Sequence, residues 1–334
     1  MSVTNNLNIP TPVLAWFMDD DYDTYGKNAY SATKLIAPIR QTVLTNQLMR
    51  GDINLLGEKI LPMPVDASSR LASRIGQTIH GALENLWRSG KAIEILSKNF
   101  PEEAEIYRHL KINPDDESDT KNSLFMEQRR FLEIQPGLFV TGKYDLVDRG
   151  RLKDYKTGGT YLYRKDKTED YTLQGSLYRL LAPHIIIDDY ATFYELYINW
   201  SSKRANAMPD TYPPAPSIEK TVKLMSIEET RDWANNRITL INAYDKLPQV
   251  ELPLCTDKDL WIGPPEFKYF SKLENKRATK TFGTDRAAAD AFLKEKGGKG
   301  HVVTVQGKAA RCNHCPVFHV CSQKDMLIDN DQLA

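Results

Sequence analysis

The chain has 334 residues, of which 41% are hydrophobic and 26% are charged, and its 44 acidic side chains balance its 44 basic ones. This length predicts about two domains, and the composition excludes a collagen, a coiled coil and a wholly disordered chain. No apolar run approaches the roughly 20 residues that a membrane-spanning helix needs. Segment 1–12 lacks the basic and apolar regions of a secretory signal. We therefore expect a soluble, cytoplasmic protein with no membrane partner.

Helical periodicity is clearest between residues 67 and 88, where apolar side chains recur at spacings of three and four. Earlier in the chain, Ser31 stands where the N-cap of a helix would be. Pro101 is typical of a first helical turn and predicts a second helix over 101–110. The acidic segment 113–122 interrupts this pattern.

Extended segments then alternate with helical ones. A tight hairpin turn is expected at 148–151, between the second and third of the strands given next. The predicted elements, in order, are strands over 124–134, 138–147 and 152–156, a helix over 171–181, strands over 192–200 and 220–225, and a helix that runs from the capping box 226–229 to about residue 246.

A smaller block near the C-terminus has a β-α-β pattern, with a strand over 278–282, a helix over 285–296 and a strand over 301–306. Residues 266–311 hold eleven basic and five acidic side chains, a local net charge of +6. This charge is compatible with a solvated surface or with a surface that follows a DNA backbone. The aromatic residues of the block, Tyr269, Phe270 and Phe282, are candidates to stack on bases, although Phe282 also suits the core of the block.

The hairpin carries the first candidate site. Asp154 and Lys156 are two residues apart on a strand and so point to the same side, and Asp145 on the adjacent strand can face Asp154. With the backbone carbonyl of Tyr155, these carboxylates form a hard-oxygen site suited to Mg²⁺ or Mn²⁺. A neighbouring lysine can orient a water or stabilise charge on a phosphate, as in metal-assisted phosphodiester hydrolysis. Surface salt bridges are the alternative for this pattern taken alone.

Two flanking helices carry polar residues suited to the same chemistry. His80 borders an apolar helical stripe, four residues after Gly76, where its imidazole is either a metal ligand or a half-buried, hydrogen-bonded group. On the helix after the hairpin, Gln174 and Tyr178 are four residues apart and share a face. They are suited to hold a DNA backbone or base, or else only to cap the sheet.

In this order the motifs G-x-x-x-H, G-x-x-D, D-x-K and Q-x-x-x-Y resemble the RecB-like nuclease domain of the PD-(D/E)XK superfamily, over roughly residues 65–200. The resemblance implies an α/β, restriction-endonuclease-like core: a central mixed β-sheet flanked by helices, with metal at one edge and DNA as substrate. It implies that His80, Asp145, Asp154 and the Tyr155 carbonyl bind the metal, and that Lys156 is the catalytic lysine. Gln174 and Tyr178 would then help to shape the DNA site.

The last motif is a cysteine trio with C-x2-C-x5-C spacing, formed by Cys312, Cys315 and Cys321. RecB-like nucleases of the AddB type and CRISPR-associated exonucleases end in a similar trio, which joins an earlier cysteine to hold a [4Fe–4S] cluster. Here no cysteine precedes Cys255, which is therefore the candidate fourth ligand, contributed from the other side of the insert. Four thiolates suit either a cluster or Zn²⁺, and a site without metal is the third alternative.

The sequence thus predicts a Mg²⁺- or Mn²⁺-dependent DNA exonuclease that acts on ends or single strands in recombination, repair or replication. It resembles compact phage or CRISPR-associated nucleases, which would place it in the host cytoplasm if a phage encodes it. The expected segments are 1–60 (helical), 61–250 (nuclease core), 251–311 (basic α/β insert) and 312–334 (cysteine tail). The alternatives are a non-catalytic DNA-binding or assembly protein with the same fold, and a zinc-dependent regulator. A homo-oligomer or a recombination partner protein is left open.

Overall fold

The chain divides into two units, and the sheet with the predicted site residues lies in the first. The computed structural model describes residues 3–19, 26, 28–51 and 65–334. Unit 1 comprises residues 1–36 and 63–239, and unit 2 comprises residues 37–62 and 240–334. The predicted segments 1–60 and 61–250 therefore extend in part outside the described residues.

Unit 1 is built around a mixed sheet whose strand order is β4-β5-β6-β7-β8-β9, with β2 pairing with β6 outside this path. Neighbours run antiparallel except at β2–β6, β4–β5 and β7–β8, which are parallel. The strands are β2 (Ala29–Ser31), β4 (Lys111–Ile112), β5 (Ser123–Gln135), β6 (Leu138–Asp148), β7 (Arg151–Gly158), β8 (Tyr190–Tyr197) and β9 (Ser217–Lys223). The central mixed sheet flanked by helices confirms the predicted α/β class.

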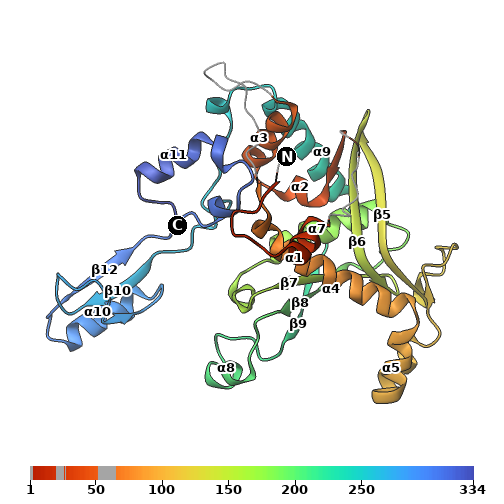
Figure 1. The fold of residues 1–334 in the computed structure, drawn as a ribbon, viewed down its shortest axis with the longest axis horizontal. Coiled ribbons are helices and arrows are strands. Elements are labelled where there is room, and N and C mark those ends of the chain that lie inside the picture. The colour runs from red at the N-terminus through yellow and green to blue at the C-terminus, as the bar shows by residue number, and fades with distance from the viewer. Residues whose placement is uncertain (1–2, 20–25, 27, 52–64) are drawn as a thin grey trace. The chain divides into compact units, whose positions relative to one another are not determined.

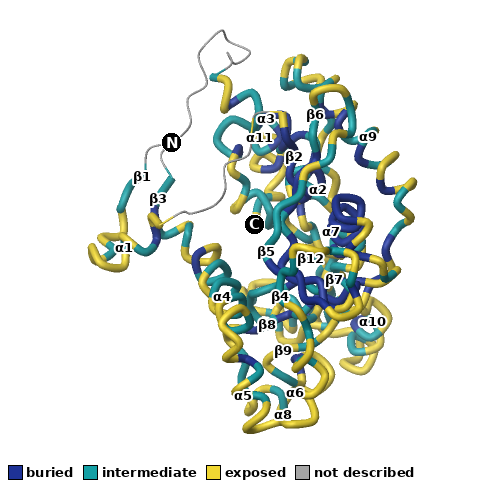
Figure 2. Tube along the Cα trace, turned by 90° about the vertical axis from the view of Figure 1, so that its right-hand side faces the viewer, coloured by how far each residue is buried: buried dark blue, intermediate teal, exposed yellow. Residues whose placement is uncertain are grey.

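Helices cover both faces of this sheet (Figure 1). Tyr155 on β7 and Trp87 of α4 pack against the same buried cluster, whereas the neighbouring Asp154 contacts Gln174 of α7, so α4 and α7 lie on opposite sides of β7. Helix α7 is mostly buried (Figure 2). The helices are α1 (Thr11–Met18), α2 (Ala32–Ile36), α4 (Leu71–Arg88), α5 (Lys91–Asn99), α6 (Pro101–Tyr107), α7 (Thr168–Leu181), α8 (Ser202–Ala207) and α9 (Ile227–Tyr244), whose last residues belong to unit 2. A two-stranded pair, β1 (Val3–Thr4) with β3 (Val65–Asp66), completes the unit.

Local signals predicted most of these elements correctly. Ser31 caps α2, since its hydroxyl accepts the Lys34 amide at 3.1 Å. The predicted turn is present, with positive φ at Arg149 (49°) and Gly150 (88°) and with Asp148 paired to Arg151, the conformation that a two-residue hairpin requires. The prediction left out α1, α5, α8 and the short strands β1, β2, β3 and β4. Three residues of strand carry no periodic signal, and β2 exists only through its pairing with β6.

Unit 2 contains α3 (Ile39–Arg50), α11 (Ser322–Asp329) and the basic insert. It also contains a buried cluster of Leu260, Ala309 and Leu327. The C-terminal end of the chain lies beside this cluster, because the Ala309 amide donates to the Gln332 carbonyl. At the base of the insert the backbones of Gly263 and Gly307 lie so close that a Cβ on Gly307 would meet the Gly263 carbonyl at 2.2 Å.

The strand, helix and strand predicted for the insert are present, but the two strands are not neighbours in its sheet. Its sheet has the order β11-β10-β12, all antiparallel, and contains β10 (Glu266–Phe270), β11 (Lys280–Thr281) and β12 (His301–Val305), with α10 (Arg286–Glu295) between the last two. Strand β10 lies in the middle and was not predicted. Tyr269 on it is 4% exposed and packs edge-on against Phe292 at 5.1 Å. It belongs to the core of the insert and is not available to stack on bases.

None of the described helices combines the length and the apolar character needed to cross a bilayer.

Candidate active site and cysteine pocket

A gap in the pairing of β6 creates the candidate active site. Along one edge, residues 139–141 of β6 pair with β2 and residues 146–148 pair with β7. The G-x-x-D motif, Gly142 to Asp145, occupies the stretch between these two ladders. Asp145 fills the gap with its side chain, because its Oδ2 accepts the backbone N–H of Tyr155 at 2.8 Å. The carboxylate thus takes the place of a ladder partner and is held between two strands.

Three carboxylates lie in one row across neighbouring strands. The β5–β6 register places Glu127 opposite Asp145, and the β6–β7 register, continued by one residue, places Asp145 opposite Asp154. Opposed residues project to the same side of a sheet. Glu127 also has a positive φ of 51°, a conformation uncommon for a residue with a side chain. The predicted face-to-face arrangement of Asp145 and Asp154 agrees with this register.

Asp154 is the most enclosed member of the row, with 1% of its surface exposed. It forms an ion pair with Lys156, which lies on the same side of β7 as predicted. Its Oδ1 also accepts a long hydrogen bond from Gln174 Nε2 at 3.4 Å. Burial and the charge of Asp145 raise the pKa of Asp154 to about 7, against the opposing effect of Lys156.

Gln174 and Tyr178 are both buried, and the Gln174 amide donates to the Tyr178 hydroxyl at 3.0 Å. The Tyr178 ring rests on Gly142, where a Cβ would lie only 2.6 Å from Cε1 of the ring. The glycine of the G-x-x-D motif is therefore the contact that lets α7 approach β6. The pair is attached to the site through Asp154 and covers the sheet at Gly142, and a contact of the pair with DNA stays a prediction.

His80 reaches the row from α4. Its Nδ1 lies 3.4 Å from Asp145 Oδ1. Burial lowers the pKa of His80, but its hydrogen bond to Asp145 and the surrounding carboxylates outweigh burial, and the pKa is raised. One turn earlier, a Cβ on Gly76 would lie 3.1 Å from Thr157 Oγ1, so this glycine brings α4 close to β7. In the G-x-x-x-H motif the glycine therefore allows α4 to pack closely on β7, and the histidine points toward Asp145.

Glu127 is the site residue that sequence reasoning missed. In the part of the chain that the structure describes, one set of three or more candidate ligands has all its ligand atoms within 4.8 Å of one another: His80, Glu127 and Asp145. Lys143 pairs with Glu127 at 2.6 Å. Burial and the Asp145 charge raise the pKa of Glu127, while Lys143 opposes them. An acidic residue opposite Asp145 in the preceding strand was the signal available in the sequence.

These groups line a cleft of about 510 Å³ in unit 1. His80, Glu127 and Asp145 bring their ligand atoms within 4.8 Å of one another, and oxygen with one imidazole is a donor set that Mg²⁺ and Mn²⁺ accept. Asp154, a predicted ligand, lines the same cleft but lies outside that set. His80, Glu127 and Asp145 therefore fit a divalent metal. Tyr155 contributes its N–H to Asp145, while its ring packs away from the row against the cluster of Leu124, Met126 and Leu146.

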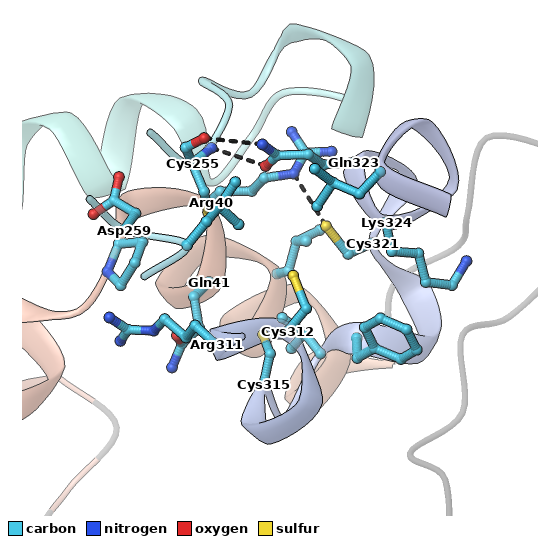
Figure 3. Close-up of a pocket in the computed structure, with 16 residues that line it drawn as sticks. Arg40, Gln41, Cys255, Asp259, Arg311, Cys312, Cys315, Cys321, Gln323 and Lys324 are labelled. Carbon is cyan, nitrogen blue, oxygen red and sulfur yellow. Dashed lines mark hydrogen bonds between the residues drawn. The ribbon is translucent and has the colours of Figure 1, made fainter. Parts of the chain in front are cut away.

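The four cysteines line a single pocket in unit 2, with Cys255 before the insert and the trio after it (Figure 3). Gln323 ties the first of them in place: its amide donates to the Cys255 carbonyl at 2.9 Å, and its oxygen accepts the Cys255 amide at 2.8 Å. Burial raises the pKa of the Cys255 thiol to about 12, and burial also raises the pKa of Cys312 and Cys315. Four half-buried thiols gathered in one pocket form a donor set for a metal or cluster that binds thiolates.

Two groups are candidates for this pocket. Four thiolates suit either a tetrahedral Zn²⁺ or an iron–sulfur cluster. The pocket gathers all four cysteines and so offers the donor set that both groups require.

No protein-family model matches the chain, and no curated protein matches it. Four solved chains do match. One is described as "Crystal structure of SSO0001"; it is 14% identical, has a TM-score of 0.38, and the match covers 71% of this chain and 89% of that chain. A likeness this distant carries no argument about function.

Proposed function

We propose that the chain is a metal-dependent deoxyribonuclease of the RecB-like type, an exonuclease that hydrolyses phosphodiester bonds at DNA ends or in single strands. The observation that carries the proposal is the row Glu127, Asp145 and Asp154, joined by His80 and Lys156 in one open cleft. A surface salt bridge would not require Asp154 to be buried beside a second carboxylate. A protein that only binds DNA would have no need to concentrate negative charge in this way.

In this proposal His80, Asp145, Asp154 and the Tyr155 carbonyl hold Mg²⁺ or Mn²⁺, and Glu127 is added to them. The ion supplies Lewis-acid polarisation of a phosphate and a bound water of lowered pKa. Lys156, paired with Asp154, orients the attacking water or offsets the negative charge that develops on the phosphate. Gln174 holds Asp154 in position through its amide, and Tyr178 holds Gln174.

The cysteine pocket belongs to the same proposal as a structural site. In it Cys255, Cys312, Cys315 and Cys321, which line one pocket, hold a [4Fe–4S] cluster, with Zn²⁺ as the alternative. The group would join the C-terminal segment to the residues before the insert, since its ligands come from both sides of the insert. An intracellular location, a role in recombination, repair or replication, and a phage or CRISPR-associated setting complete the proposal.

The test is cleavage of end-labelled linear DNA and of closed circular DNA, each with Mg²⁺, with Mn²⁺ and with EDTA. Metal-dependent loss of linear DNA alone is expected, and the position of the label gives the polarity. Asp154→Asn and Lys156→Ala should each reduce cleavage by at least 100-fold and leave DNA binding within a few-fold of wild type. Asp232→Asn, an exposed acid on α9, is the matched control and should cleave normally.

Three results decide between the alternatives. Cleavage that persists in Asp154→Asn would contradict the assignment of Asp154 to the active site. Binding without cleavage by the wild-type chain, with its cysteine-bound metal verified, would favour the DNA-binding or assembly protein. Loss of circular DNA as well would make the enzyme an endonuclease.

A further inference from the structure

An arginine lies among the four cysteines, and nothing in the motif pattern accounts for it. Arg40 on α3 is 2% exposed, and its Nε donates to the Sγ of Cys321 at 3.3 Å (Figure 3). Residues 40 and 321 are 281 positions apart in the chain. A buried guanidinium is costly unless its donors are satisfied and its charge is offset.

The other donors of Arg40 are all used, which fixes its orientation. Nη1 donates to the carbonyls of Gln249 and Leu252, each at 3.2 Å. Nη2 donates to the Gln249 side-chain oxygen at 3.2 Å and to the Ser322 hydroxyl at 2.8 Å. With Nε on Cys321, all five N–H groups of the guanidinium have acceptors. The charge is therefore held rigidly, and only one of its contacts is with a potential metal ligand.

None of those acceptors carries a formal negative charge except a deprotonated cysteine. The carbonyls, the amide oxygen and the hydroxyl solvate the guanidinium without neutralising it. The charge of Arg40 is thus directed at the thiolates. This explains why an arginine is buried here at all, since four thiolates around a metal group give a net anionic site that a fixed cation stabilises.

We propose that Arg40 is a positioning and charge-tuning residue of the cysteine site, which holds Cys321 and raises the reduction potential of the iron–sulfur group bound there. This inference rests on the cofactor part of the proposed function and is independent of the nuclease part. Reduction adds negative charge to the cluster, so a cation and an N–H donor at a ligand sulfur favour the reduced state. Hydrogen bonding to a ligand is also a means of orienting it.

A second arginine in the same pocket provides a matched comparison. Arg311 also lines the pocket, but its guanidinium lies over the Trp261 ring at 5.2 Å. It contributes charge near the cysteines, whereas Arg40 contributes charge and a hydrogen bond to sulfur. Replacing each arginine with glutamine therefore separates the contact with Cys321 from the general effect of a nearby cation.

The experiment uses the full chain, purified without oxygen, as wild type, Arg40→Gln, Arg40→Lys and Arg311→Gln. Iron, acid-labile sulfide and zinc are measured first. The reduction potential of the iron-loaded proteins is then measured by dithionite titration with mediators, followed by absorbance and electron paramagnetic resonance. We expect the potential of Arg40→Gln to be shifted below that of wild type, and by more than the shift in Arg311→Gln. Arg40→Lys keeps the charge but loses the fork of donors, so its potential should lie between wild type and Arg40→Gln.

The outcomes separate this inference from the proposals on which it stands. An iron-loaded Arg40→Gln with the wild-type potential, or with a shift no larger than that of Arg311→Gln, overturns it. If Arg40→Gln does not retain iron, the reduction potential of Arg40→Lys decides. A potential below that of wild type supports the inference, and a potential equal to that of wild type refutes it. A wild-type chain that holds zinc and no iron overturns the cofactor assignment and this inference with it. A chain that carries the cluster but cleaves no DNA contradicts only the nuclease proposal.

Discussion

At the scale of single residues, repulsion among the carboxylates of the cleft raises the pKa of two of them and makes them depend on neighbouring cations. Glu127 and Asp154 both have raised pKa values, and in both cases the charge of Asp145 adds to the effect of burial. Asp145 itself is fixed by the Tyr155 amide and by His80. The central carboxylate is therefore positioned by the fold, while the outer two depend on cations, Lys143 for Glu127 and Lys156 for Asp154.

Glu127 should contribute to ion binding although no motif includes it. We predict that Glu127→Gln weakens Mn²⁺ binding by about 10-fold or more, because a ligand charge is lost from the set formed with His80 and Asp145. Isothermal titration with Mn²⁺ measures this directly. The exposed Glu219 on β9 is the control, and Glu219→Gln should bind like wild type. Equal affinities for wild type and Glu127→Gln would exclude Glu127 from the metal site.

Two glycines should respond to alanine in opposite directions. A Cβ on Gly142 would collide with the Tyr178 ring at 2.6 Å, whereas a Cβ on Gly81, inside α4, meets nothing within 4 Å. Gly142→Ala should lower the free energy of unfolding by about 1–3 kcal/mol through overpacking. Gly81→Ala should raise it by about 0.5–1 kcal/mol, because alanine has the higher helix propensity. Chemical denaturation of both variants checks the signs, and stabilisation by Gly142→Ala would contradict the packing described at α7.

At the scale of elements, the turn between β6 and β7 is stabilised by a buried acid. Asp148 is 3% exposed and accepts from Lys153 at 2.6 Å and from Arg149 at 2.9 Å. Burial alone would raise the pKa of Asp148, but the two cations outweigh it and the pKa is lowered. Asp145 and Asp154 lie on these same two strands, so the hairpin contributes both to stability and to the geometry of the site.

The lowered pKa of Asp148 gives the sign of its pH dependence. The stabilisation is complete above the unfolded-state pKa, about 4, and is lost as the pH falls through the lower folded-state value. We predict that Asp148→Asn costs about 3 kcal/mol at pH 7, and that the difference from wild type shrinks below about pH 4. Urea unfolding over a pH series measures it. Asp170→Asn, which removes a more exposed pair with Lys167, should stay within about 0.5 kcal/mol at every pH.

The insert is the other element whose role can be tested separately. The connection between β10 and β11 exposes Lys272, Lys276 and Arg277. If the insert follows a DNA backbone, changing all three to glutamine should weaken DNA binding and lower the slope of log affinity against log salt by about 1 for each phosphate that is no longer neutralised. Fluorescence anisotropy at several salt concentrations gives both values. The equally exposed Lys91, Lys98 and Lys121, changed together to glutamine, provide the charge-matched control, and an equal weakening in the two triple variants would assign the effect to net charge.

At the scale of the whole molecule, the chain passes between the two units more than once, because unit 2 takes residues 37–62 from between two parts of unit 1. Among the described residues of unit 2, Leu260, Ala309 and Leu327 form a buried cluster against which Cys255 and Cys312 pack. A group bound by the cysteines would therefore be joined to the packing of the C-terminal segment.

We predict that Cys315→Ser, which removes one ligand, speeds amide hydrogen exchange in residues 309–333 and leaves the β5–β9 sheet protected. Removing a ligand lowers the local stability of the segment that the bound group holds, whereas the sheet has its own hydrogen bonds. Hydrogen-exchange mass spectrometry resolves the two regions. Unchanged exchange in 309–333 would show that the cysteines carry no structural group, and loss of protection throughout the chain would show that the site supports both units.

What the sequence by itself determined about this protein is local. The turn at Arg149 and Gly150, the cap at Ser31 and the common side of Asp154 and Lys156 follow from backbone conformation and side-chain alternation, which involve neighbours in the chain. From the order of the motifs we could predict that His80, Asp145 and Gln174 lie near one sheet, because each motif lies on its own helix or strand.

Tertiary structure alone decided which distant segments complete those sites. Glu127 joins the cleft through strand register, Arg40 meets Cys321 across 281 positions, and β10 enters the middle of the insert sheet and buries Tyr269. None of these contacts is encoded by a local period or a fixed spacing. Each arises because a strand edge must be paired, a buried charge must find acceptors, or an aromatic ring must be covered, and the partner is set by the whole fold.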